Sequence, residues 1–271
     1  HLSLRRQRQM CIRDRPEITR PSRLIVDESL ASSAINPKPG HSEIRGYWKT
    51  WLVISTFCVI WFAGTMLAIV VLFIGLDLFG ISQSFSMHLS ISLAYLVGIP
   101  LILLFMYSDK QLPDLLSKFT IESGKQAMTL MLAIPVIISI VDFILVIGYG
   151  LVYEFAFGIP EVNTEIGVDW GSGPVALGLV ITSTVIIAPI AEELMFRGYL
   201  LDSIRKMHGD WIAIVISSLI FGLIHIEPYT VGMAMIGGLI YGYVRIRTGS
   251  LWPSIIGHMI WNGIALVVTY L

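Results

Sequence analysis

Residues that can do chemistry recur at four-residue spacing in the most apolar part of this 271-residue sequence. They form three pairs, of which five of the six members are polar: Glu193 and Arg197 in AEELMFRG, Phe221 and His225 in FGLIH, and His258 and Asn262 in HMIWN. A four-residue offset places both members of a pair on one helical face. A charged group at the centre of a membrane helix costs about 2.5–3.5 kcal/mol on insertion scales. We therefore expect these groups to be functional.

The first motif holds two adjacent glutamates, which we expect to have different roles. Neighbouring side chains on an α-helix point about 100° apart. Glu193 has Arg197 one turn further on and can form a local ion pair with it. Glu192 has no such base and is free to face a cavity. Because Pro189 removes a helical hydrogen bond, we also expect the helix to kink or restart there, and a restart would place both glutamates in its first turn.

A glutamate and a histidine on separate helices can activate a water molecule, because either group can take its proton near neutral pH. A second histidine with an asparagine one turn away supplies two donors for a developing oxyanion. This set indicates hydrolysis of an amide or ester. A second interpretation has Glu192, His225 and His258 holding a Zn²⁺ ion, with a fourth position open to water. The motif His-Glu-x-x-His is absent, and the spacing does not separate the two interpretations.

The composition indicates a membrane protein. The sequence is 55% hydrophobic and 14% charged, whereas soluble domains carry about 25% charged residues. Apolar runs of about 20 residues, long enough to cross a bilayer, recur along it. The fold class we predict is all-α, a polytopic membrane helix bundle. The seven expected spans are Trp51–Leu76, Ser86–Tyr107, Ala127–Tyr153, Pro174–Ile190, Trp211–Ile226, Val231–Val244 and Leu251–Leu271.

The positive charges alternate between the two sides of these spans. All 18 Lys and Arg fall in the segment up to Lys49, the Lys110–Lys125 loop, the Arg197–Lys206 stretch and the Arg245/Arg247 loop. This is the positive-inside pattern, and it predicts the N-terminus in and the C-terminus out. With a net charge of −1 and no basic stripe, we expect the lipid bilayer and no nucleic acid as a partner.

The predicted spans place Glu192 and His225 near opposite ends of the membrane. Water activation needs the two groups within hydrogen-bond reach, directly or through one water. We therefore expect short or steeply tilted helices around one water-filled cavity, where irregular backbone is tolerated. This cavity should hold Glu192, His225, His258 and Asn262 and open towards the side of Arg205 and Lys206.

The three motifs, in this order, resemble those of the CAAX-protease and bacteriocin-processing family of intramembrane proteases. The resemblance covers about Pro174–Leu271 and includes the segment AEELMFRGYL. It implies that Glu192 and His225 activate water and that His258 and Asn262 stabilise the oxyanion. It assigns supporting positions in the site to the remaining motif residues: Glu193, Arg197 and Phe221. The implied substrate is a peptide or membrane protein, prenylated or of leader type, in a bacterial plasma membrane.

The chain divides into three regions. Residues 1–47 are rich in Pro, Ser and charges and should be disordered, and residues 1–15 resemble a translated sequencing adapter, so we expect them not to be native. Residues 48–173 form the N-terminal transmembrane region, which is variable in the family, with an interfacial helix near 111–122. Residues 174–271 form the protease-like core.

Two other functions stay open beside the intramembrane protease. One is a non-catalytic immunity or scaffold protein of the same fold, although no motif residue is missing. The other is a small proton-coupled transporter with Asp142 in a relay, although no inverted repeat is evident. Asp142 should line the cavity or bond a neighbouring helix, whereas His88 and Glu227 should lie at the surface.

Overall fold

A computed structural model describes residues 41–160 and 173–270, which are helical apart from short connections and contain no strand. The predicted all-α class is therefore confirmed. The predicted adapter-like segment and most of the segment predicted to be disordered lie outside the described residues. The first described helix, α3, begins at His41, inside the segment predicted to be disordered.

The helices follow one another with short turns. In chain order they are α3 (His41–Leu78), α4 (Gln83–Ser108), α5 (Leu112–Ser117), α6 (Gly124–Met128), η1 (Thr129–Ala133), α7 (Ile134–Phe157), α8 (Gly173–Val180), η3 (Ile181–Ile187), α9 (Ala188–Glu193), η4 (Leu194–Leu200), α10 (Leu201–His208), α11 (Asp210–Leu223), α12 (Pro228–Thr248) and α13 (Trp252–Tyr270). The segments labelled η are π-helical, and they join their neighbours into two long helices, 124–157 and 173–208.

Four helices among the described residues are long and apolar enough to cross a membrane. They are Tyr47–Leu78, Gln83–Ser108, Gly124–Phe157 and Gly173–His208, and Asp210–Leu223 and Trp252–Val268 are shorter apolar helices. These long apolar helices identify the chain as an integral membrane protein. The count of seven spans and the orientation stay predictions. The short helix α5 lies within the predicted interfacial segment.

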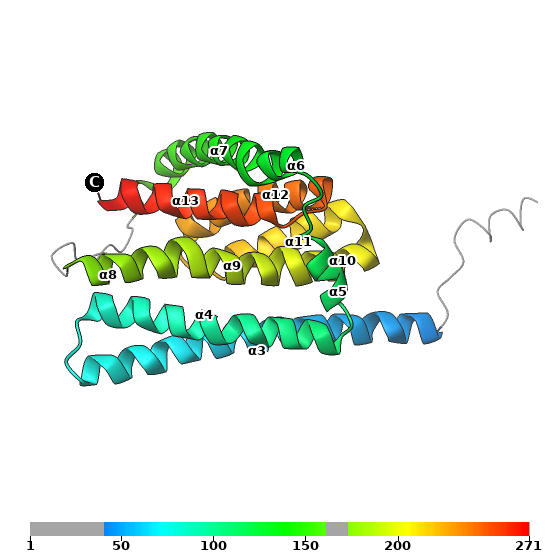
Figure 1. The fold of residues 1–271 in the computed structure, drawn as a ribbon, viewed down its shortest axis with the longest axis horizontal. Helices are drawn as coiled ribbons and strands as arrows, with labels where there is room; N and C mark the ends of the chain where they lie inside the picture. Colours follow the sequence, from blue (N-terminus) through cyan, green and yellow to red (C-terminus); the bar gives the residue numbers. More distant parts are fainter. Residues whose placement is uncertain (1–40, 161–172, 271) are drawn as a thin grey trace, which may run out of the picture. The chain divides into compact units, whose positions relative to one another are not determined.

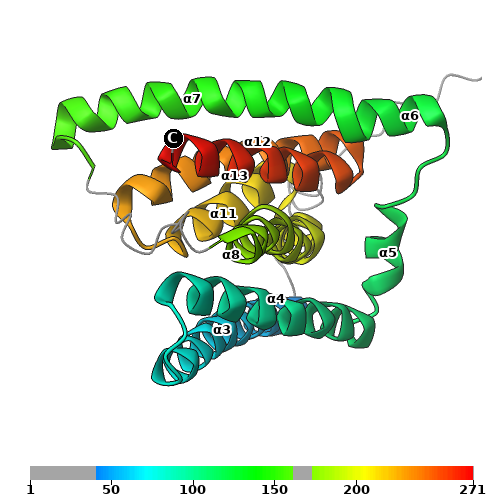
Figure 2. The same cartoon turned by 60° about the vertical axis from the view of Figure 1, so that its left-hand side comes forward.

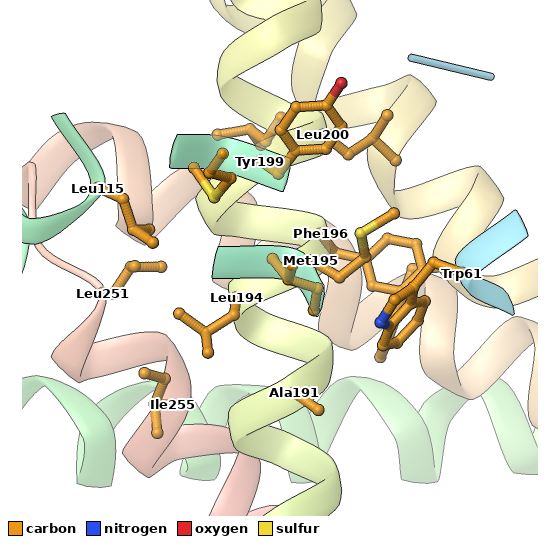
Figure 3. Close-up of a cluster of buried hydrophobic side chains, with 14 of the residues drawn as sticks. Trp61, Leu115, Ala191, Leu194, Met195, Phe196, Tyr199, Leu200, Leu251 and Ile255 are labelled. Atoms are coloured by element: carbon orange, nitrogen blue, oxygen red, sulfur yellow. The ribbon is translucent and has the colours of Figure 1, made fainter. Parts of the chain in front are cut away.

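From Tyr47 onward the helices form one unit arranged around the long helix 173–208. Figures 1 and 2 show the pair α3 and α4 on one side of it and α12 and α13 on the other, with α7 crossing the outside of α12 and α13. The buried core is centred on the same helix (Figure 3), where Leu194, Met195 and Tyr199 meet Trp61 from α3 and Leu251, which directly precedes α13.

The long helix continues through Pro189 to His208, so of the two expected effects of the proline the restart is absent, and Glu192 lies in the middle of this helix. The backbone widens before the proline, where the N–H of Ala188 bonds the carbonyl of Ser183, five residues back. The same π spacing would pair the carbonyl of Thr184 with position 189, where proline has no N–H. Asn262 of α13 supplies the missing donor, because its Nδ2 lies 2.9 Å from that carbonyl.

A buried group of charges, which we call the Asp202 cluster, joins α5, α10 and α12. The Asp202 carboxylate contacts Lys118 Nζ and lies 3.0 Å from Arg245 Nη2, and Lys118 also pairs with Asp114 at 3.1 Å. The backbone carbonyl of Lys118 accepts the N–H of Leu251 at 3.1 Å. The cluster thus fixes the basic end of the bundle, where α12 turns into α13.

Candidate active site

The predicted ion pair between Glu193 and Arg197 is present and fully buried. Glu193 Oε1 lies 2.6 Å from Arg197 Nη1, and the two side chains are 0% and 1% exposed. The guanidinium carbon of Arg197 lies 4.3 Å from the centre of the Phe221 ring and 5.6 Å from that of Tyr241. Aromatic faces attract cations when the site is desolvated. Arg197 is therefore fixed by a carboxylate and two rings.

His258 lies between the two glutamates. Its Nδ1 is 3.1 Å from Glu193 Oε1, and its Nε2 is 3.8 Å from Glu192 Oε2. An ionised carboxylate only accepts hydrogen bonds, so Nδ1 carries the proton that faces Glu193. The imidazole stacks on Tyr241 at a centroid distance of 5.6 Å, which orients the ring. The opposite nitrogen is close enough to Glu192 for one water molecule to touch both.

Glu192 is the less buried of the two glutamates, with 12% of its side chain exposed. Its Oε1 accepts a hydrogen bond from the hydroxyl of Tyr95 at 2.8 Å. Over the residues that the structure describes, no Lys or Arg forms an ion pair with Glu192. The two glutamates therefore have different environments, since only Glu193 pairs with an arginine, while their different roles stay a prediction.

His225 follows the end of α11 and is half-buried. Its Nδ1 lies 2.8 Å from the carbonyl oxygen of Phe221 in α11. A carbonyl can only accept, so Nδ1 is the donor, and the tautomer with its single proton on Nδ1 leaves a lone pair on Nε2. The chain turns immediately afterwards through Ile226, a β-branched residue at φ +65°. Backbone strain of this kind is found at functional sites, and here it holds His225 at a helix end.

The Phe221 ring connects the three motifs. It lies 5.1 Å from the His225 ring and 5.8 Å from the His258 ring, centre to centre, in addition to its contact with Arg197. Asn262, one turn beyond His258, has one N–H committed to the Thr184 carbonyl. An amide carries two such hydrogens, so the second is available for another acceptor.

A cavity of about 610 Å³ adjoins these residues. Its polar lining includes five side chains from four parts of the chain: His88, Asp142, His225, His258 and Asn262. Most of its other walls are apolar, for example Val146, Met233 and Trp261. Three of the four residues predicted to share a cavity therefore line it. Glu192 does not line it but contacts His258, which does.

The direction of the cavity differs from the prediction. It is lined near the beginning of α4 and of α12, by His88 and Tyr229, and near the end of α13, by Val268. Arg205 and Lys206 in α10 lie at the other end of the helices, on the right in Figure 1. The cavity therefore extends away from the side on which we expected it to open.

The motifs did not indicate Tyr95, and the surface position expected for His88 was wrong. His88 is buried, with Nδ1 3.1 Å from Ser183 Oγ. Asp142 fulfils both of its expectations, because it lines the cavity and accepts a hydrogen bond from Tyr241 at 2.8 Å. The position of Tyr95 in the sequence could have indicated its role. Tyrosines of membrane proteins are enriched at the two interfaces, whereas Tyr95 lies in the middle of an apolar span.

The residues proposed for zinc do not form a ligand group. Within 41–160 and 173–270, no three His, Cys, Asp or Glu side chains gather closely enough to hold a metal ion. The set Glu192, His225 and His258 therefore does not fit the zinc interpretation, and no step below depends on a metal.

Residues 174–264 match the family model described as type II CAAX prenyl endopeptidase Rce1-like. The match covers about a third of the chain and all three motifs, and it confirms the resemblance inferred from them. No curated protein and no solved structure matches the chain. Tyr95, His88 and Asp142 lie outside the matched region.

Proposed function

We propose that this membrane protein, whose matched region belongs to a family of proteases, is an intramembrane endopeptidase of the CAAX-protease type. The observation that carries the proposal is the position of His258, which contacts Glu193 and lies 3.8 Å from Glu192 while also lining the cavity. Carboxylate and imidazole groups brought together at a cavity are suited to moving a proton to and from water.

In the proposed reaction, Glu192 takes a proton from a water molecule that the free Nε2 of His225 helps to orient. The water oxygen bonds to the carbonyl carbon of the substrate, and the carbonyl oxygen becomes negatively charged. The second N–H of Asn262 donates to this oxyanion, and so does His258 Nε2, which in this step carries a proton in addition to the one on Nδ1. When the carbon–nitrogen bond breaks, the proton held by Glu192 passes to the departing amine.

The cavity also supports a class of substrate. Its walls are mostly apolar side chains from α7, α12 and α13, and its polar lining includes the motif residues His225, His258 and Asn262. Such a lining favours a peptide with an apolar or lipid-modified segment beside the bond that is cut. Prenylated C-terminal peptides and leader-type membrane peptides both have this chemistry.

The decisive test is cleavage by the purified protein in detergent or lipid. Prenylated Cys-a-a-X peptides and apolar leader peptides are incubated with wild type and with Glu192→Gln and His225→Ala. Loss of a general base typically lowers the rate about 10²–10⁴-fold, and we expect losses of this size in both variants. Glu154→Gln, which changes an exposed carboxylate on α7, should retain full turnover.

Two results would contradict the proposal. One is near-normal turnover of Glu192→Gln or His225→Ala at equal amounts of folded protein. The other is the absence of Glu192-dependent cleavage for every peptide tested, which would favour a non-catalytic role for the same fold.

A further inference from the structure

The hydroxyl of Tyr95 contacts the glutamate to which we assign the chemistry. Tyr95 lies on α4, outside the matched region, and its ring is buried. Its oxygen is 2.8 Å from Glu192 Oε1. Because an ionised carboxylate only accepts, the phenol is the donor. A hydrogen bond to a charged acceptor is about twice as strong as a neutral one.

The Tyr95 ring is itself held in place from the other side. Trp61 of α3 packs against it at a centroid distance of 6.1 Å. The indole N–H of Trp61 donates to the carbonyl of Gly98 at 3.2 Å, and a Cβ at position 98 would lie only 3.2 Å from the same nitrogen. A glycine here lets the indole approach α4, so Trp61, Tyr95 and Glu192 form a continuous series of contacts.

This contact makes the two carboxylate oxygens of Glu192 different from each other. Oε1 is occupied by Tyr95, whereas Oε2 is 3.8 Å from His258 Nε2. The hydrogen bond opposes rotation of the carboxylate, so the same oxygen stays directed towards His258. Groups that hold a reacting atom in its productive geometry contribute strongly to rate.

We infer that Tyr95 is a positioning residue that directs Glu192 Oε2 towards the attacking water, and this inference rests on the proposed hydrolytic function. The N-terminal transmembrane region thus contributes to a site whose motifs all lie in the matched region. Tyr95 acts through Glu192 and does not itself contact the substrate.

The kinetic test compares Tyr95→Phe, which removes only the hydroxyl, with wild type on a cleaved peptide. We expect the turnover number to fall about 10-fold to 100-fold, as for the loss of one hydrogen bond to a charged group. The Michaelis constant should change little, because substrate contacts are retained. The matched control is Tyr107→Phe, an exposed tyrosine of the same helix, which should behave as wild type.

A second measurement separates this inference from the proposed function, because it needs no activity. Melting temperatures are compared for wild type, Tyr95→Phe, Glu192→Ala and the double variant. If the hydroxyl and the carboxylate are bonded, the double variant loses less than the sum of the single losses, since contacting residues are not additive.

The two measurements test the role of Tyr95 and the protease function separately. Additive losses, or a Tyr95→Phe enzyme with wild-type turnover, would overturn the role of Tyr95 while leaving the protease function intact. Non-additive losses in a protein that cleaves none of the peptides would establish the contact but overturn the function, and with it the role of Tyr95 in positioning.

Discussion

The guanidinium of Arg197 is a buried charge surrounded by one carboxylate and aromatic rings. One of its nitrogens pairs with Glu193, whereas Nε and Nη2 find no hydrogen-bond partner among the described residues, and the guanidinium carbon lies over the Phe221 ring. Removing one member of a buried ion pair leaves the other charge uncompensated, which costs about 3–5 kcal/mol.

We therefore expect Glu193→Ala to lower the free energy of unfolding by about this amount. The control is Arg205→Ala, because Arg205 pairs with Asp210 at 2.6 Å while both side chains are more than 40% exposed. Surface pairs contribute only about 0–1 kcal/mol. Denaturant unfolding in detergent measures both changes, and equal losses would argue against a structural role for the Glu193 pair.

Glu227, expected as a simple loop charge, caps the start of α12. Its carboxylate accepts the N–H groups of Tyr229 at 2.9 Å and of Thr230 at 2.6 Å, and also the Thr230 hydroxyl at 2.6 Å. Partial burial would raise the pKa of Glu227, but these hydrogen bonds outweigh it and lower the pKa below its ordinary value of 4.5.

The lowered pKa of Glu227 predicts a pH-dependent contribution to stability. The contribution is present above about pH 4.5, the value for the unfolded chain, and is lost as the pH falls through the folded pKa. Glu227→Ala should cost about 0.5–2 kcal/mol at pH 7, as for other N-caps. The gap in melting temperature between wild type and Glu227→Ala should narrow at pH 3. A gap of equal size at both pH values would disprove this assignment.

The π-helical segment before Pro189 explains why the first motif was only partly predictable. Four-residue spacing correctly predicted the Glu193–Arg197 pair, because that pair depends on one helix alone. The carbonyl that Pro189 cannot pair accepts a hydrogen bond from Asn262, which lies 73 residues further along the sequence than the proline. A local rule for proline cannot include such a partner.

This arrangement predicts that Pro189→Ala compensates for Asn262→Ala in stability. Pro189→Ala supplies an N–H that can bond the Thr184 carbonyl in the π spacing, so Asn262 is no longer required there. Asn262→Ala alone should lower the melting temperature, and the double variant should regain most of that loss. Its turnover number should stay low, about 10²–10³-fold below wild type, if Asn262 also binds the oxyanion.

The two roles of Asn262 are distinguished by comparing these readouts. Equal stability losses for Asn262→Ala in the wild-type and the Pro189→Ala backgrounds would show that the Thr184 contact does not depend on the proline. Recovery of both stability and turnover would show that Asn262 acts only through the helix. A change confined to the Michaelis constant would assign Asn262 to substrate binding.

Across the whole bundle, the apolar runs and their order were predictable, whereas the contacts between helices were not. The runs give the positions of helices because composition sets where a chain can cross lipid. The contact between Tyr95 and Glu192 depends on how α4 is rotated against the central helix, which no spacing within either helix reports. The helix α11, Asp210–Leu223, is also too short to span a bilayer of about 30 Å at 1.5 Å per residue.

The orientation of the bundle is a prediction that cysteine labelling can check. In a background without Cys11 and Cys58, Ser82→Cys and Lys125→Cys each place a thiol at an exposed position in a turn or at a helix start. The positive-inside pattern predicts that a membrane-impermeant maleimide labels Ser82→Cys in intact bacterial cells and Lys125→Cys only after lysis. The reverse labelling would invert the orientation.

The Asp202 cluster has a consequence for biogenesis. Its members enter the growing chain in the order Lys118, Asp202 and Arg245, so the cluster is incomplete until α12 has been synthesised. A chain that ends before Arg245 leaves the Asp202 carboxylate without one of its two cationic partners. It also lacks Leu251, the backbone donor to Lys118. The final helices therefore complete the basic end of the bundle, and we expect a prematurely terminated chain to leave charged groups of the Asp202 cluster without their partners.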